Sequence, residues 1–282
     1  MRYTAEFCDR EYNARAMIPD HPAIFARWAR VAQDVRAHAH ARLGLAYGSS
    51  PKQSLDFFPA AHADAPLFVF VHGGYWRSLD KSDFSWIAPP FVERGVAVAM
   101  LNYDLLPAVS VHTIVLQVLR ALEWLWRESE TLGFDPSRIV VGGHSAGGHL
   151  AAMSACALWP QWDPDLPADL VAGVVSVSGL YDLEPLRHTT FLGPDLALDE
   201  AGAFRASPAW MTPATGAPVV TAAGGLESES FKAQSALLAQ RWPRNVVADL
   251  PMPGRNHLTV VDALAEPGNP LFEAALGLCR GA

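Results

Sequence analysis

The chain reads GHSAG at residues 143–147, directly after the apolar run RIVVG (138–142) and before the helix-like stretch GHLAAM (148–153). A serine on a tight turn between a strand and a helix is held in a strained backbone conformation. Glycines two residues to either side let the neighbouring elements pack closely. The pattern predicts a nucleophile elbow at Ser145. Such a serine reacts only when other parts of the chain supply a base, an acid and an oxyanion hole.

The composition excludes several classes of protein. Of the 282 residues, 50% are hydrophobic and 18% are charged, and the net charge is −8. The basic residues are not clustered, so nucleic acid is not expected as a partner. No apolar run approaches the length of a membrane span and no apolar signal region is visible, so we expect a cytoplasmic protein. The three cysteines fit neither a metal site nor a disulfide framework.

Apolar runs alternate with amphipathic stretches from residue 67 onward. Strands are predicted at 67–71, 95–101, 139–141, 170–177, 217–223 and 245–250, and helices at 111–127, 230–242 and 271–278. This alternation predicts an α/β fold with a mostly parallel sheet, helices on both faces and all strand carboxyl ends at one edge. A helix is also predicted between Pro22 and Leu43. Residues 1–50 would then form an N-terminal helical cap segment on a single domain of residues 1–282.

An oxyanion loop is predicted directly after the first of these strands, where His72 precedes Gly73 and Gly74. The N–H groups of adjacent glycines can turn toward an oxyanion because no Cβ obstructs the approach. They would act together with the N–H of Ala146, the residue after the nucleophile. The alternative interpretation is an ordinary Gly-Gly turn.

The acid and the base should follow the serine in that order along the chain. Only His257 comes after the last predicted strand, in a loop that could place its imidazole over Ser145. The loop after the fifth strand contains no aspartate, so Glu227 is the first choice for the acid, Glu229 the second and Asp182 the third. A glutamate can hold the histidine tautomer and stabilise the imidazolium.

Aromatic residues near the oxyanion loop predict a flat apolar pocket for an aryl group, formed by Tyr75, Trp76 and Tyr181. The tyrosines could instead anchor loops. Arginines of the N-terminal segment could meet a substrate carboxylate, although solvated arginines are more common. These arginines are Arg10, Arg15, Arg27 and Arg30.

Taken together, these residues resemble the α/β-hydrolase superfamily, in its hormone-sensitive-lipase-like branch. The closer resemblance is to the kynurenine formamidase family and its bacterial esterase relatives. It rests on the elbow, on HGGYW at 72–76, EYNAR at 11–15, SGLYDL at 178–183 and the 227–235 stretch, and on the loop of His257. The resemblance implies a Ser-Asp-His triad, an HGG oxyanion hole, and no cofactor or metal. This chain offers Glu227 where an aspartate is usual.

The motifs predict a serine hydrolase that acts through an acyl-enzyme. The resemblance implies that it cleaves a small aryl N-formyl amide or a short-chain carboxylic ester. A general carboxylesterase is the alternative within this class. A non-catalytic small-molecule binding protein on the same fold is the alternative from another class. The expected partner is a small-molecule substrate, and a homodimer is left open.

Overall fold

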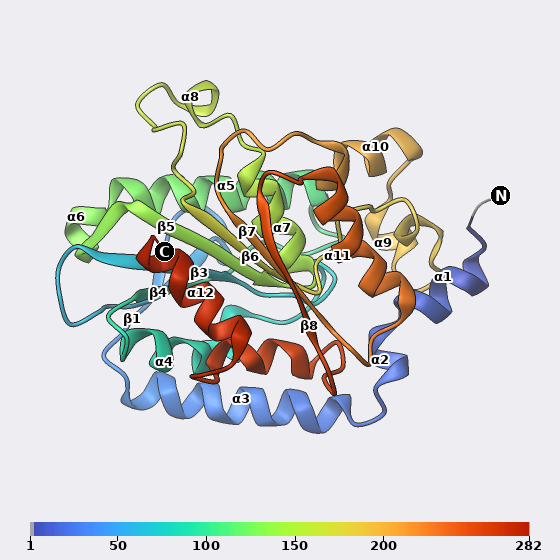
Figure 1. The fold of residues 1–282 in the computed structure, drawn as a ribbon, viewed down its shortest axis with the longest axis horizontal. Coiled ribbons are helices and arrows are strands. Elements are labelled where there is room, and N and C mark those ends of the chain that lie inside the picture. Colours follow the sequence, from blue (N-terminus) through green and yellow to red (C-terminus); the bar gives the residue numbers. More distant parts are fainter. Residues whose placement is uncertain (1–2, 282) are drawn as a thin grey trace.

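In the computed structural model, residues 3–281 are described and their eight strands form one sheet in the order β1-β2-β4-β3-β5-β6-β7-β8 (Figure 1). Residues 1, 2 and 282 of the predicted domain lie outside the described residues. The strands are β1 (Arg42–Ala46), β2 (Ser54–Phe58), β3 (Ala65–Val71), β4 (Ala97–Leu101), β5 (Phe134–His144), β6 (Gly173–Val177), β7 (Val219–Gly224) and β8 (Val246–Met252). Neighbours from β4 to β8 pair in parallel, which confirms the predicted α/β fold with a mostly parallel sheet.

Helices connect these strands and precede the first of them. The α-helices are α1 (Ala5–Tyr12), α2 (Ala14–Met17), α3 (His21–His38), α4 (Ala88–Val92), α5 (Val111–Arg127), α6 (Ser129–Leu132), α7 (Ala146–Ala155), α8 (Trp159–Trp162), α9 (Gly193–Leu196), α10 (Glu200–Arg205), α11 (Glu229–Arg241) and α12 (Pro270–Arg280). Short 3-10 turns are η1 (Lys81–Asp83), η2 (Ser85–Ile87), η3 (Leu186–His188), η4 (Pro208–Trp210) and η5 (Thr259–Ala265).

Both faces of the sheet are covered, and β3 shows how its sequence achieves this. Leu67, Val69 and Val71 belong to the core shared with α5, α7 and α11. Phe68 and Phe70 belong to the opposite core, shared with α3, α4 and α12 (Figure 1). Because successive side chains of a strand point to opposite faces, a strand buried on both faces reads as a continuous apolar run.

The antiparallel edge of the sheet corrects one prediction. The predicted helix between Pro22 and Leu43 is too long, because α3 ends at His38 and residues 42–46 form β1. This strand pairs with β2, and β2 pairs antiparallel with β4. The first 50 residues are therefore not wholly helical, since pairing of residues 42–46 with β2 overrides the local helical pattern.

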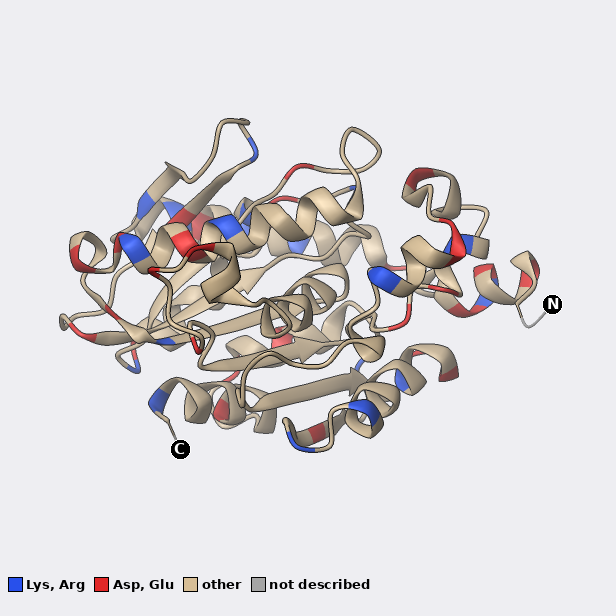
Figure 2. Ribbon diagram, turned by 90° about the horizontal axis from the view of Figure 1, so that it is seen from above, with Lys and Arg blue, Asp and Glu red and all other residues tan. Residues whose placement is uncertain are grey.

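Charged side chains are spread over many elements of the described chain. Segments with Lys or Arg and segments with Asp or Glu are interspersed over the helices and loops (Figure 2). Within residues 3–281, no helix has both the length and the apolar character needed to cross a bilayer. In the same residues, no group of three or more His, Cys, Asp or Glu side chains is placed to bind a metal ion.

Candidate active site

Ser145 lies on the turn between β5 and α7, with φ 57° and ψ −118°. A positive φ in a residue with a side chain stores roughly 1–3 kcal/mol of strain and is concentrated at functional sites. The flanking glycines permit the turn. A Cβ on Gly143 would lie 2.2 Å from the carbonyl oxygen of Gly147, and one on Gly147 would lie 2.0 Å from that of Val71. The elbow forms at the predicted position.

Three side chains from three loops meet at the carboxyl edge of the sheet. Nε2 of His257 lies 3.0 Å from Oγ of Ser145, and its Nδ1 lies 2.7 Å from Oε2 of Glu227. Because Glu227 accepts the Nδ1–H, the lone pair on Nε2 faces the serine hydroxyl, as a general base requires. The structure thus brings together the three residues predicted as catalytic.

Glu227 is 7% exposed and is held by several donors. Its Oε1 accepts hydrogen bonds from Oγ of Ser178 at 2.5 Å and from the N–H of Gly224 at 2.6 Å. Burial acts to raise the pKa of Glu227, but His257 and these hydrogen bonds outweigh burial and hold the pKa below its ordinary value. A carboxylate with this low pKa is ionised at neutral pH and can stabilise an imidazolium on His257.

Ser178→Ala would remove one of the donors to Glu227. We expect the free energy of unfolding at pH 7 to fall by about 1.5–3 kcal/mol, as for a hydrogen bond to a charged group. Urea unfolding measures this loss. The hydrogen bond from Ser178 stabilises the ionised form of Glu227. The difference in unfolding free energy between wild type and variant should therefore shrink as the pH falls and Glu227 becomes protonated in both proteins. A loss that stays constant with pH would mean that Ser178 contributes by packing alone.

The predicted oxyanion donors lie near the nucleophile: Ala146 follows it in the chain, and Gly74 lines the same cavity as Ser145. A Cβ on Gly73 would lie 3.2 Å from Cβ of Ser145, and one on Gly74, at φ 98°, would lie 2.2 Å from the carbonyl oxygen of Ser78. Within residues 3–281, the N–H groups of Gly73, Gly74 and Ala146 have no acceptor among the protein's own hydrogen bonds. These donors are available to an oxygen of a ligand.

His72 anchors the loop of Gly73 and Gly74 through contacts with Asn102 and Tyr103. Its Nε2 lies 2.9 Å from Oδ1 of Asn102, and the hydroxyl of Tyr103 donates to its carbonyl oxygen at 2.8 Å. Burial lowers the pKa of His72, so the ring is neutral and serves as an anchor. Tyr75 and Trp76, which follow in the loop, are held at positive φ angles of 53° and 56°.

His144, the second residue of GHSAG, holds the loop that carries His257. Its Nε2–H donates to the carbonyl oxygen of His257 at 2.7 Å, and the two ring centres lie 4.9 Å apart. Burial lowers the pKa of His144 to about 3, so the ring remains a neutral donor. The motif gives no signal of this role, because the bond reaches a backbone atom 113 residues away.

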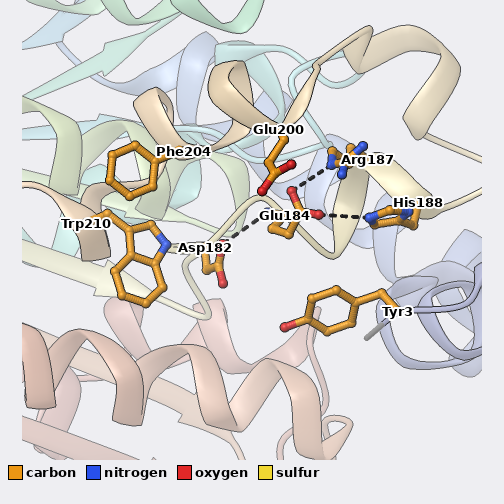
Figure 3. Close-up of a pocket in the computed structure, with 8 residues that line it drawn as sticks. All are labelled: Tyr3, Asp182, Glu184, Arg187, His188, Glu200, Phe204 and Trp210. Carbon is orange, nitrogen blue, oxygen red and sulfur yellow. Dashed lines mark hydrogen bonds and ion pairs between the residues drawn. The ribbon is translucent and has the colours of Figure 1, made fainter. Parts of the chain in front are cut away.

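Of the three candidate acids, Glu227 alone is hydrogen-bonded to His257 among the described residues. Glu229 has an 89% exposed side chain and pairs with Lys232 at 2.6 Å. Asp182 accepts from the N–H of Glu184 and lines a separate cavity of about 470 Å³ (Figure 3). None of the three predicted catalytic residues lines that cavity. The structure therefore places both alternatives away from the histidine.

The cavity beside Ser145 is small. Its volume is about 20 Å³, which is room for about one water molecule. Tyr75 lines it, but Trp76 and Tyr181 are 0% exposed and do not. Trp76 packs edge-on against the buried His149 with ring centres 5.1 Å apart, and Trp76 belongs to the core below the loop. An aryl group therefore enters only if this cavity widens.

Residues 11–15 lie across the site and join two of its loops. The carbonyl oxygen of Tyr12 accepts a hydrogen bond from the hydroxyl of Tyr75 on the oxyanion loop. The carbonyl oxygen of Glu11 accepts from Oγ of Ser228 at 2.6 Å, next to Glu227. Helices α1 and α2 thus connect the oxyanion loop to the loop of the acid.

Several known proteins are similar to this chain. Kynurenine formamidase of Salmo salar is 29% identical over 243 residues, which are 82% of this chain and 79% of the salmon protein. Kynurenine formamidase of Drosophila melanogaster is 34% identical over 168 residues, which are 58% of this chain and 54% of the fly protein.

Solved structures extend the similarity to almost the whole fold. A crystal structure from Silicibacter sp. tm1040, of a protein provisionally named a thioesterase, has a TM-score of 0.83 and 34% identity and covers 93% of this chain and 96% of that chain. Esterase B of Lactobacillus rhamnosis shares the fold, with a TM-score of 0.70, 23% identity, and coverage of 95% of this chain and 96% of that chain. The BD-FAE family model matches residues 55–240. The chain belongs to the BD-FAE family and has the fold of the α/β-hydrolase esterases.

Proposed function

We propose that the chain is a serine hydrolase that cleaves a small aryl N-formyl amide or a short-chain carboxylic ester through an acyl-enzyme. The observation that carries the proposal is the continuous hydrogen-bonded series from Glu227 through His257 to Ser145. Within residues 3–281, the backbone N–H groups of Gly73, Gly74 and Ala146 beside it have no protein acceptor. The salmon and fly relatives are named kynurenine formamidases, which favours the formamide over the ester.

The reaction follows from the positions of these groups. Nε2 of His257 takes the hydroxyl proton of Ser145 as Oγ attacks the carbonyl carbon. The N–H groups of Gly73, Gly74 and Ala146 donate to the oxyanion of the tetrahedral intermediate. His257 then protonates the leaving amine or alcohol, and the acyl group stays on Ser145. A water molecule that gives its proton to the same histidine hydrolyses this ester and releases the acid.

Kinetics on N-formylkynurenine and p-nitrophenyl acetate, measured side by side, test the choice of substrate. We expect the higher kcat/KM for the formamide, although p-nitrophenolate is the better leaving group. A site that binds the rest of the substrate uses that binding energy to stabilise the transition state. A higher kcat/KM for the acetate ester would assign the chain to the short-chain carboxylesterases instead.

The same proposal includes the organisation of the chain. We propose a single domain over residues 1–282 in which the N-terminal residues act as a cap. The contacts of Glu11 and Tyr12 with two loops of the site support this role. A cytoplasmic location and a homodimer remain predictions from the sequence.

A further inference from the structure

Arg15 is the one arginine of residues 3–281 that is partly shielded from water and has no carboxylate partner. The other described arginines either form an ion pair with Asp or Glu or are exposed at the surface. Removing a guanidinium from water is costly unless an opposite charge and hydrogen bonds compensate. The guanidinium of Arg15 therefore has no counter-charge within residues 3–281, and an anionic ligand could supply one.

The guanidinium of Arg15 is held against the loop that carries the oxyanion donors. Its Nη2 donates to Oγ of Ser78 at 2.6 Å, and its central carbon lies 5.4 Å from the centre of the Phe25 ring. A guanidinium offers five N–H donors. Within residues 3–281, the Ser78 hydroxyl is its only hydrogen-bond acceptor. The remaining donors are free to bind a ligand.

Arg15 also lies close to the reacting groups, because it lines the same cavity of about 20 Å³ as Ser145 and His257. A second cavity, of about 210 Å³, is also lined by Ala14 and His257. The two cavities therefore share two lining residues, and Arg15 and Ser145 line the smaller one together.

The charges around Arg15 favour an anionic ligand. Burial and the neighbouring guanidinium of Arg77 lower the pKa of Arg15. Arg77 is itself paired with Asp195 at 2.8 Å, so that carboxylate is already engaged. A planar carboxylate matches the fork of a guanidinium and can accept two parallel hydrogen bonds from it.

We propose that Arg15 binds a carboxylate on the aryl leaving group of the substrate, so that the preferred substrate is an anionic aryl formamide or ester. This inference rests on the proposed function for the bond that is cleaved. The competing explanation is that Arg15 only ties the N-terminal segment to the oxyanion loop through Ser78. That role would affect all substrates alike, whereas a carboxylate site affects only the anionic ones.

Two esters that differ by one carboxylate, phenyl acetate and 3-acetoxybenzoate, separate these roles. In Arg15→Gln, the ratio of kcat/KM for 3-acetoxybenzoate to that for phenyl acetate should fall about 10- to 100-fold, as for the loss of a charge-assisted hydrogen bond. In Arg15→Lys, which keeps the charge but loses the fork, the fall should be smaller. Arg10→Gln is the matched control, because Arg10 is exposed and pairs with Glu11. A loss common to both esters cancels in the ratio, so an unchanged ratio in Arg15→Gln would overturn the proposal.

Benzoate binding tests the anion site without turnover. Titration calorimetry of the Ser145→Ala protein should detect benzoate, and the Ser145→Ala/Arg15→Gln protein should bind it about tenfold more weakly or worse. Equal binding to both proteins, or no binding of millimolar benzoate to Ser145→Ala, would contradict the proposal. If the wild-type protein hydrolyses neither ester nor a formamide, the proposed function fails, and this titration still decides the anion site.

Discussion

Replacing Ser145 with alanine should lower kcat by about 10⁶-fold, the scale seen when the nucleophile of a serine hydrolase triad is removed. Without Oγ no acyl-enzyme forms, and the remaining donors act only on direct attack by water. The protein should also lose its reaction with a fluorophosphonate probe. Initial rates on the better of the two proposed substrates, with the probe in parallel, measure both effects.

A control separates loss of chemistry from loss of fold. Ser154 is a buried serine on the same helix, α7, whose hydroxyl donates to the carbonyl oxygen of Ala151 at 2.6 Å. Ser154→Ala should keep probe labelling, and both variants should unfold cooperatively in urea. Turnover that survives in Ser145→Ala would remove this residue from the mechanism. A wild-type protein that the probe does not label would favour the non-catalytic binding protein on a hydrolase fold.

The central strands and their order in the sequence are predictable because a strand buried on both faces appears as a continuous apolar run. The run at 67–71 and the helix at 111–127 appear in the structure with little or no change. The strand β1 is not predictable in the same way. Its residues are mostly exposed and follow a helix that has no strong stop signal. They form a strand because they pair with β2. Edge strands of this kind are decided by tertiary pairing rather than by local pattern.

The same contrast divides the residues of the candidate site. Ser145 and His257 can be found from a motif and from chain order, because the chemistry restricts both. Ser178 and His144 cannot, since their roles depend on contacts with Glu227 and with the backbone of His257 that no spacing encodes. Trp76 does not line the cavity beside Ser145, although the sequence predicts an aromatic pocket that includes it, and the reason is related. A large ring next to a functional loop is equally suited to the core that supports the loop.

Glu227→Gln should lower kcat by about 10³- to 10⁴-fold, close to the effect of amidating the acid in other serine triads. The physical reason is the tautomer of His257. Gly224 and Ser178 both donate to Oε1 of Glu227, so the amide oxygen of a glutamine would take that side. Its NH₂ group would then face Nδ1 of His257 and require a lone pair there. The proton would move to Nε2, where the ring can no longer accept from Ser145.

Two matched variants make this prediction specific. Glu229→Gln removes an exposed carboxylate whose pair with Lys232 is of the surface type, worth about 0–1 kcal/mol at most, and Asp182→Asn removes the other alternative acid. Both should keep kcat near the wild-type value. A loss in either that matches the loss in Glu227→Gln would contradict the assignment of the acid.

The pH dependence of stability gives an independent measure of the same carboxylate. The pKa of Glu227 in the folded protein lies below its ordinary value of 4.5, so its ionised form stabilises the fold above that pH. As the pH falls through the lower pKa of the folded state, this contribution is lost. The difference in unfolding free energy between wild type and Glu227→Gln should therefore shrink between neutral and acidic pH, measured by urea unfolding. If the stability of the wild type relative to Glu227→Gln instead rises as the pH falls toward 4.5, the buried carboxylate is neutral in the folded protein. A neutral acid could not stabilise the imidazolium that the reaction requires.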